Sequence, residues 1–231
     1  SGRILVENED VTLLPATDRD VSMVFQSYAL FPHMSVLENV SYGLKMINVP
    51  KEEFTEKSLE TLKLVNLEGY ENRMPSELSG GQQQRVAVAR AIVLKPKVLL
   101  FDEPLSNLDA KLRRQVREDI REIQQKLGVT TIYVTHDQEE ALAISDKVIV
   151  MNNAIIAQQG SPKELYNFPK TKFVANFIGD ANVVKAEIIN QNNNVYEIQL
   201  AEMKINIESD QKLESSVSVS LRPEKITISK S

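Results

Sequence analysis

The sequence contains no cysteine among its 231 residues, and it has no long hydrophobic run. Without cysteine the chain can form neither a disulfide framework nor a thiolate metal site, which suits a reducing compartment. The longest apolar candidate, residues 86–94, is interrupted by Arg90 and is far shorter than the roughly 18 residues needed to span a bilayer. No secretory signal is present and the chain starts with Ser1, so we expect a processed, trimmed or engineered piece.

The sequence also lacks a basic block, and its formal net charge is −5. A surface devoted to nucleic acid is usually basic, so we expect no nucleic-acid partner. The hydrophobic fraction of 42% is ordinary for a chain that buries a core. The length suits one large domain, or one domain with a small appendage.

Three short motifs follow one another along the chain: Leu-Ser-Gly-Gly-Gln at residues 78–82, an apolar run ending in Asp-Glu-Pro at residues 98–104, and His136 after a β-branched run. Each could arise by chance. Together, in this order, they indicate a protein that binds a nucleoside triphosphate and hydrolyses it.

The acidic pair Asp102 and Glu103 follows a short apolar run, which predicts a strand buried on both faces of a parallel sheet. Ligands and metals collect at the carboxyl ends of such strands. Asp102 could hold Mg²⁺, and Glu103 could orient or deprotonate an attacking water. The alternative is a solvated acidic turn, which the neighbouring motifs disfavour.

The glycines Gly80 and Gly81 precede a predicted helix that Pro96 stops. Glycine lets backbone amides approach an anion closely, and a helix start adds partial positive charge. The Ser79 hydroxyl could donate to the same phosphate. A flexible loop with a serine cap is the alternative, although Gln82 and the residues after it make the pattern much rarer.

Two polar residues end predicted strands elsewhere in the chain. His136 could hydrogen-bond a terminal phosphate or the attacking water, and Gln26 could reach toward a metal in the same pocket. Either residue alone is more often structural. His33, the other histidine, lies in a Phe-Pro-His loop and is interpreted as structural.

One motif that such a site requires is missing from these residues. The 231 residues contain no G-x-x-x-x-G-K-[ST], the loop whose backbone amides and lysine cradle the β- and γ-phosphates.

Strands alternate with helices up to about residue 166, which predicts an α/β layered domain. Asn152-Asn153 is expected to form a tight turn between two strands, because asparagine tolerates positive φ. A capping box at residues 161–164 predicts a helix start. After about Phe177 short alternating segments predict a small β domain.

These motifs, with Ser-Asn-Leu-Asp at residues 106–109 and Thr-His-Asp at residues 135–137, resemble the nucleotide-binding subunit of an ATP-binding-cassette transporter. The resemblance implies a P-loop NTPase-like α/β cassette with a helical subdomain at about residues 32–85. It also implies ATP and Mg²⁺ as ligands, a location on the cytoplasmic face of the membrane, and ATPase activity coupled to solute uptake.

The resemblance assigns a role to each matching residue. Gln26 is similar to the Q-loop glutamine that senses Mg²⁺, Asp102 to the Walker B aspartate, and Glu103 to the catalytic base. Asp109 resembles the D-loop aspartate at the dimer interface, and His136 resembles the switch histidine.

A run of four consecutive residues resembles the family signature: Ser79, Gly80, Gly81 and Gln82. In the family this segment contacts the γ-phosphate bound to the opposing subunit. The implied partners are therefore a second ATPase subunit, identical or paired, and permease subunits that meet the helical subdomain. A solute-binding protein is an indirect partner.

Finer features resemble importer ATPases for polyamines, ferric iron, sugars, phosphonates or sulfate. The segments at residues 173–179 and 221–224 resemble the accessory TOBE domain of that branch, an oligonucleotide-binding-like β fold. We therefore expect an ATPase domain over residues 1–167 and a TOBE-like domain over residues 168–231. In relatives this domain usually continues past the Arg-Pro-Glu segment, so an incomplete barrel is expected.

The absent Walker A segment would lie upstream of Ser1 in the family and includes a central strand. We expect this N-terminally truncated chain, by itself, to bind ATP poorly, to hydrolyse it negligibly and to leave strand edges unpaired. Two alternatives stay open: a soluble ATPase of DNA repair or translation, and a non-catalytic fragment with only dimer or regulatory contacts. The sequence does not identify the transported solute, because in this family the permease and the solute-binding protein determine which solute is transported.

Overall fold

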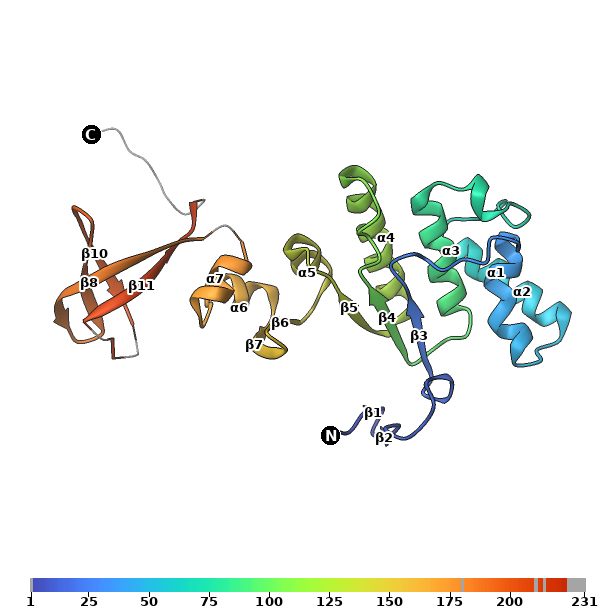
Figure 1. Cartoon of the computed structure of the whole chain (residues 1–231), viewed down its shortest axis with the longest axis horizontal. Helices are drawn as coiled ribbons and strands as arrows, with labels where there is room; N and C mark the ends of the chain where they lie inside the picture. The colour runs from blue at the N-terminus through green and yellow to red at the C-terminus, as the bar shows by residue number, and fades with distance from the viewer. Residues whose placement is uncertain (1, 180, 210–211, 214, 224–231) are drawn as a thin grey trace. The chain divides into compact units, whose positions relative to one another are not determined.

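The computed structural model describes residues 2–179, 181–209, 212–213 and 215–223 (Figure 1). The chain divides into two compact units, Ser1–Glu140 and Ala141–Ser231. Each unit is described by itself below. Glu224, in the segment that resembles the accessory domain, lies outside the described residues.

A three-stranded parallel sheet forms the centre of the first unit. Its order is β3 (Val21–Val24), β4 (Val98–Asp102) and β5 (Thr130–Val134), with the middle strand flanked on both sides. The register places Phe101 beside Val24 on one side and beside Tyr133 on the other. The chain therefore leaves all three strands at the same edge, where polar residues follow each strand.

The two faces of this sheet differ in burial. Val24, Leu99 and Phe101 are fully buried on one face. On the other face Leu100 of β4 is only partly buried, and Ile132 and Val134 of the neighbouring β5 keep 54% and 52% of their surface exposed. The expectation that β4 is buried on both faces is therefore wrong, because the part of the chain that the structure describes covers only one of them.

Three helices pack together in the first unit: α1 (Val36–Met46), α2 (Lys51–Leu64) and α3 (Gly80–Ile92), and each contacts the other two (Figure 1). The helix starts follow local signals. Ser35 caps α1 in a capping box with Glu38. The fourth helix, α4 (Ala110–Leu127), has one apolar stripe and ends at Gly128 with a φ of 62°.

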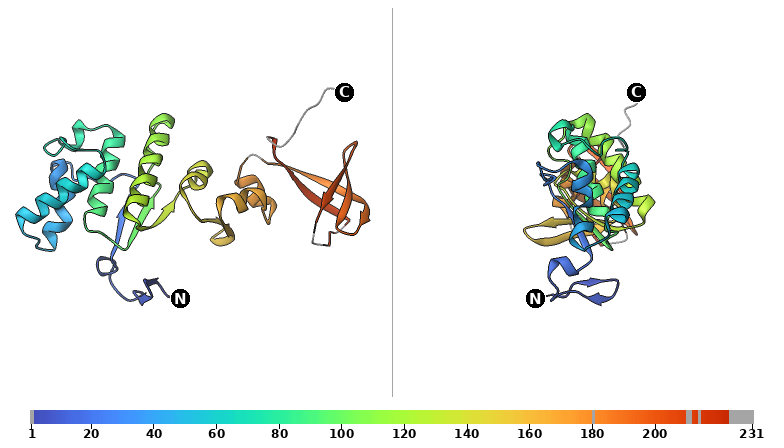
Figure 2. Two further views of the ribbon diagram at one scale, coloured as in Figure 1. Left: turned by 180° about the vertical axis from the view of Figure 1, so that it is seen from behind. Right: turned by 90° about the vertical axis from the view of Figure 1, so that its right-hand side faces the viewer.

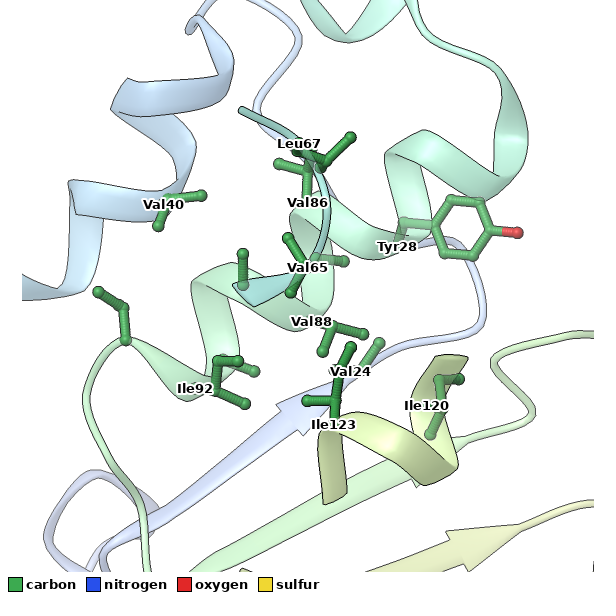
Figure 3. Close-up of a cluster of buried hydrophobic side chains, with 14 of the residues drawn as sticks. Val24, Tyr28, Val40, Val65, Leu67, Val86, Val88, Ile92, Ile120 and Ile123 are labelled. Carbon is green, nitrogen blue, oxygen red and sulfur yellow. The ribbon is translucent and has the colours of Figure 1, made fainter. Parts of the chain in front are cut away.

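The buried side chains of these helices meet the covered face of the sheet. Figure 3 shows Val88 of α3 beside Val24 of β3 and Ile123 of α4, within one hydrophobic cluster. Each fully buried side chain of this size contributes about 1.5–3 kcal/mol relative to an exposed one. This core fixes the sheet against α3 and α4, the two helices whose first residues carry the predicted site segments.

Near the N-terminus, β1 (Leu5–Val6) and β2 (Glu9–Asp10) pair antiparallel. The helix that follows His136 is α5 (Gln138–Ile144). Within the described residues, no helix combines the length and the hydropathy needed to cross a lipid bilayer.

The second unit begins within α5, and its first strands are an antiparallel pair, β6 (Val148–Asn152) and β7 (Ile155–Gly160). The turn between them differs from the prediction by one residue. Asn152 pairs with Ile155 inside the ladder, and the residues at positive φ are Asn153 (48°) and Ala154 (60°). The strand register therefore outweighs the preference of asparagine for this conformation at Asn152.

The rest of the second unit confirms the predicted small β domain. Two short helices, α6 (Pro162–Asn167) and α7 (Lys172–Phe177), precede a four-stranded antiparallel sheet. Its twisted strands are visible in Figure 2. In chain order they are β8 (Asn182–Asn192), β9 (Val195–Leu200), β10 (Met203–Glu208) and β11 (Ser216–Leu221). Their core includes Ala186, Tyr196 and Ile198.

Candidate functional site

Four of the predicted site residues gather at the carboxyl edge of the parallel sheet. Gln26 lies two residues beyond β3, Asp102 ends β4, Glu103 follows it, and His136 lies two residues beyond β5. Adjacent strands in register bring these segments together although they are far apart in the sequence. The structure thus assembles the acidic pair, the glutamine and the histidine at one edge.

Glu103 and His136 form the central contact of the site. The imidazole Nδ1 of His136 lies 3.1 Å from the carboxylate Oε2 of Glu103. The Glu103 side chain is 32% exposed, whereas the His136 side chain is 74% exposed. A carboxylate held by an imidazole and open to solvent can accept a proton from a bound water.

The backbone of Glu103 is left-handed, with a φ of 44°. For a residue with a Cβ this conformation costs of the order of 1–3 kcal/mol and persists only where the surroundings impose it. Here the Glu103 N–H donates to the Val134 carbonyl at 2.9 Å. The strand register therefore holds Glu103 in the orientation that faces His136.

Ser106 connects Gln26 to the acidic pair, a role that the sequence did not reveal. The Gln26 Nε2 donates to the Ser106 Oγ at 3.0 Å, and that hydroxyl donates to the Glu103 carbonyl at 3.0 Å. The Asn107 side chain donates to the Gln26 carbonyl. The only sequence signal was the Ser-Asn-Leu-Asp segment itself, which says nothing of what Ser106 contacts.

The donor chemistry at this edge fits Mg²⁺. Asp102 supplies a half-buried carboxylate. The Gln26 amide donates to Ser106 through its nitrogen, so this hydrogen bond leaves the amide oxygen, the atom that could bind a metal, available. Mg²⁺ is commonly held by one or two carboxylates together with substrate phosphates and waters. Among the described residues, no group of three or more histidine, cysteine or acidic side chains could hold a metal by itself.

The turn that carries His136 borders a small polar pocket. The pocket is lined by Glu103, Ser106, Arg113, Thr135, His136, Asp137 and Glu140. Close to this pocket, burial and the nearby Glu140 carboxylate raise the pKa of the Tyr133 phenol, which therefore stays protonated as a hydrogen-bond donor. Arg113 and Glu140 carried no signal in the sequence, because each belongs to a helix pattern that predicts only structure.

The segment that resembles the family signature begins α3. The Ser79 Oγ accepts from the Gln82 N–H at 3.4 Å, and the Gln82 Oε1 accepts from the Ser79 N–H at 2.8 Å. This capping box leaves the hydroxyl proton of the exposed Ser79 able to donate. The local role of Ser79 and Gln82 is therefore compatible with an additional contact to an anion.

Gly81 has a packing requirement as well as a possible role in anion binding. A Cβ at Gly81 would lie 2.9 Å from the Leu112 Cδ1 and 3.3 Å from the Val116 Cγ2. At Gly80 the corresponding nearest atom is the Leu108 Cδ2, at 3.1 Å. Gly81 thus permits the close approach of α3 and α4, and Gly80 permits that of α3 and the turn before α4.

Asp109, predicted to lie at a dimer interface, is exposed and caps α4. Its Oδ1 accepts from the Leu112 N–H at 3.0 Å. Its preceding neighbour, Leu108, is buried and offers its carbonyl to the Arg113 guanidinium at 3.0 Å. The Asp109 carboxylate therefore has a definite structural role in this chain, and its place in a dimer stays a prediction.

Comparison with known proteins agrees with the motifs. A family model described as "ABC transporter" matches residues 1–106. The chain is 58% identical over 228 residues to the Fe(3+) ions import ATP-binding protein FbpC of Agrobacterium fabrum, covering 99% of this chain and 65% of that protein. The protein of the same name from Photorhabdus laumondii is 53% identical over 230 residues, which cover 100% of this chain and 64% of that protein.

A solved structure is also similar. The structure of cbiO1 from Clostridium perfringens, described as part of the ABC transporter complex cbiONQ, matches with a TM-score of 0.65 and 33% identity. The match covers 71% of this chain and 68% of that one. The predicted fold class is thereby confirmed, while the chain spans about 65% of the length of the curated relatives. The chain belongs to the ABC transporter family.

Proposed function

We propose that this chain is part of the ATP-hydrolysing subunit of an importer, and that the imported solute is ferric iron. The motifs and the family support the first statement. The second rests on curated relatives that are 53–58% identical and carry the name of an Fe(3+) import ATP-binding protein. An accessory TOBE-like domain over residues 168–231, after an ATPase domain over residues 1–167, belongs to the same proposal.

The observation that carries the proposed chemistry is the contact between His136 and Glu103. The Glu103 carboxylate takes a proton from the attacking water, and His136 orients that carboxylate and the water. Asp102 and Gln26 would hold Mg²⁺, which when bound neutralises charge on the phosphate oxygens. Ser106 keeps the Gln26 amide beside the acidic pair. The rest of the catalytic effect is positioning of the reacting groups.

The proposed working form is a pair of ATPase subunits. Ser79 to Gln82 of one copy would contact the γ-phosphate held by the other, since the exposed Ser79 hydroxyl and the start of α3 both favour an anion. Asp109 would lie at the interface of the pair. The helical region at about residues 32–85 would contact permease subunits on the cytoplasmic face of the membrane, with a solute-binding protein as an indirect partner.

The substitution Glu103→Gln in the complete protein tests the catalytic part of this proposal. We expect ATP turnover to fall at least about 100-fold, because the general base is lost, while ATP binding is retained. Glu122→Gln is the matched control, since Glu122 is exposed on α4 and pairs only with Lys126 in the contacts described. Turnover in the Glu103→Gln protein equal to that of the control would reject the assignment of Glu103.

A transport measurement tests the importer and its solute. The complete protein should co-purify with membrane subunits and support ATP-dependent uptake of ferric iron in vesicles. Co-purification with no membrane protein favours a soluble ATPase instead. Uptake of another solute, with ferric iron left outside, would reject the iron assignment and leave the ATPase assignment intact.

A further inference from the structure

A buried carboxylate lies directly behind the turn that carries His136, and the proposed chemistry does not use it. Glu140 is only 3% exposed. Its Oε2 accepts from the Thr135 Oγ1 at 2.8 Å and from the Tyr133 hydroxyl at 3.2 Å. A buried carboxylate is costly unless it is hydrogen-bonded and paired with a cation.

The cation that faces Glu140 is Arg113, in the first turns of α4. Its Nε lies 3.9 Å from the Glu140 Oε1, and its Nη1 lies 3.5 Å from the Asp137 Oδ2. Its Nη2 donates to the Leu108 carbonyl at 3.0 Å. One planar guanidinium therefore joins three segments: the turn before α4, the turn after β5 and the start of α5.

These contacts anchor the residues on both sides of His136. Thr135 is bonded to Glu140, and the Asp137 N–H donates to the Thr135 Oγ1 at 3.0 Å. Asp137 is also paired with Arg113 and accepts from two N–H groups at the start of α5. The His136 ring is largely exposed, so its position comes from these anchored neighbours rather than from packing around the ring.

We propose that Arg113 and Glu140 form a latch, named here the Arg113–Glu140 latch, that holds the His136 imidazole within reach of Glu103. Both are positioning residues, and the inference rests on the proposed function. Because Arg113 also holds the Leu108 carbonyl, the latch ties the turn leading into Asp109 to the His136 turn. A shift of either turn is thereby transmitted to the contact between His136 and Glu103.

A purely structural role for Glu140 leads to a different expectation. In that case its loss lowers the stability of the whole unit, without a specific change at His136. The chain offers a direct way to separate the two, because it contains only two histidines. His33 lies in another segment, with its ring 6.2 Å from the Phe31 ring, and serves as an internal reference.

The first measurement is a ¹H–¹³C spectrum of the two imidazoles in the full 231-residue chain. Arg113→Lys keeps the charge, but a single ammonium cannot both donate to the Leu108 carbonyl and lie beside the Asp137 and Glu140 carboxylates. Arg114→Lys is its control, because Arg114 is exposed and pairs with Glu118 along α4. Glu140→Gln removes the buried charge with little change in shape, and Glu139→Gln, at an exposed neighbour, is its control. We expect the His136 signal to move or broaden in Arg113→Lys and Glu140→Gln, with His33 unchanged. The two controls should leave both signals in place.

The second measurement is ATP turnover in the complete protein. Arg113→Lys should lower kcat roughly tenfold and leave KM for ATP within about twofold, because the latch orients the reacting groups and does not hold the nucleotide. Arg114→Lys should leave both constants unchanged. A wild-type protein without turnover would reject the proposed ATPase function, while the imidazole spectra would still decide on the latch.

Equal His136 signals in Arg113→Lys and Arg114→Lys would overturn the latch. If the Arg113→Lys chain loses the His33 signal too, that chain has unfolded. The test of the latch then rests on the imidazole spectra of Glu140→Gln and Glu139→Gln. A His136 signal that is the same in those two glutamine variants also overturns it.

Discussion

At the scale of single residues, the site depends on side chains whose surroundings impose unusual conformations or burial. Glu103 adopts a left-handed backbone that strand pairing with Val134 maintains. Tyr28 and Ala29 are left-handed as well, with φ values of 61° and 47°, and the Arg90 guanidinium donates to both of their carbonyls. These conformations have no local signal in the sequence, because the groups that maintain them are distant along the chain.

Gln84 is a residue whose burial has a measurable consequence. It is fully buried in α3, and neither amide atom has a hydrogen-bond partner among the described residues. Gln84→Met removes that unsatisfied group at similar volume, so we expect the free energy of unfolding in urea to rise by about 1–3 kcal/mol. Gln83→Met is the matched comparison. Gln83 donates to the Pro75 and Leu78 carbonyls, so its loss should lower the same quantity by about 1 kcal/mol. Equal destabilisation by both substitutions would contradict the prediction.

At the scale of elements, the helix starts were the most predictable feature. Ser35, Ser79 and Ser161 each begin a helix in a capping box, with Glu38, Gln82 and Glu164 closing it. The signal spans four residues, so sequence alone contains it. The end of α4 at Gly128 is predictable for the same reason. The one-residue shift of the turn after β6 was not predictable, because the pairing between two strands decides it.

The capping box of α1 predicts a pH dependence of stability. Hydrogen bonds from the Ser35 backbone N–H and hydroxyl lower the pKa of Glu38 in the folded chain. A lowered pKa stabilises the fold at pH values above the unfolded pKa of about 4.3, and this stabilisation is lost as the pH falls through the folded pKa. We expect Glu38→Gln to be less stable than the wild type at pH 7, with a difference that shrinks under acid conditions.

The measurement is urea unfolding of both chains at neutral and acid pH. Glu56→Gln, at an exposed position of α2 outside any capping box, is the control and should show no such trend. A deficit in Glu38→Gln that stays constant with pH would contradict the assigned role of the carboxylate.

At the scale of the whole molecule, the parallel sheet of the first unit is open. In the described part of the chain, β3 and β5 are its two outer strands, and the face carrying Ile132 and Val134 is exposed. The expectation of unpaired strand edges agrees with this arrangement. The residues proposed to contact the metal and the attacking water lie at one edge of this sheet. The P-loop motif that would hold the phosphates beside them is not among the 231 residues.

The behaviour of the isolated chain toward nucleotide follows from this arrangement. Backbone amides and the lysine of a P-loop supply most contacts to the β- and γ-phosphates. We therefore expect the 231-residue chain alone to bind Mg·ATP more weakly than micromolar and to hydrolyse it negligibly. Isothermal titration calorimetry of the chain beside the complete protein measures the difference. Micromolar affinity in the isolated chain would show that the described residues suffice for binding.

The sequence by itself determined the family, the order of strands and helices, and which residues follow the strands of the sheet. These features depend on motifs, periodicity and caps, and each of these acts within a few neighbouring residues. Only the tertiary structure decided which polar groups meet: Gln26 with Ser106, 80 residues further along, and Arg113 with Glu140. It also decided that one face of the sheet is covered and the other is open. Such contacts join distant segments, and no local pattern encodes the distance between two side chains that only the packed core brings together.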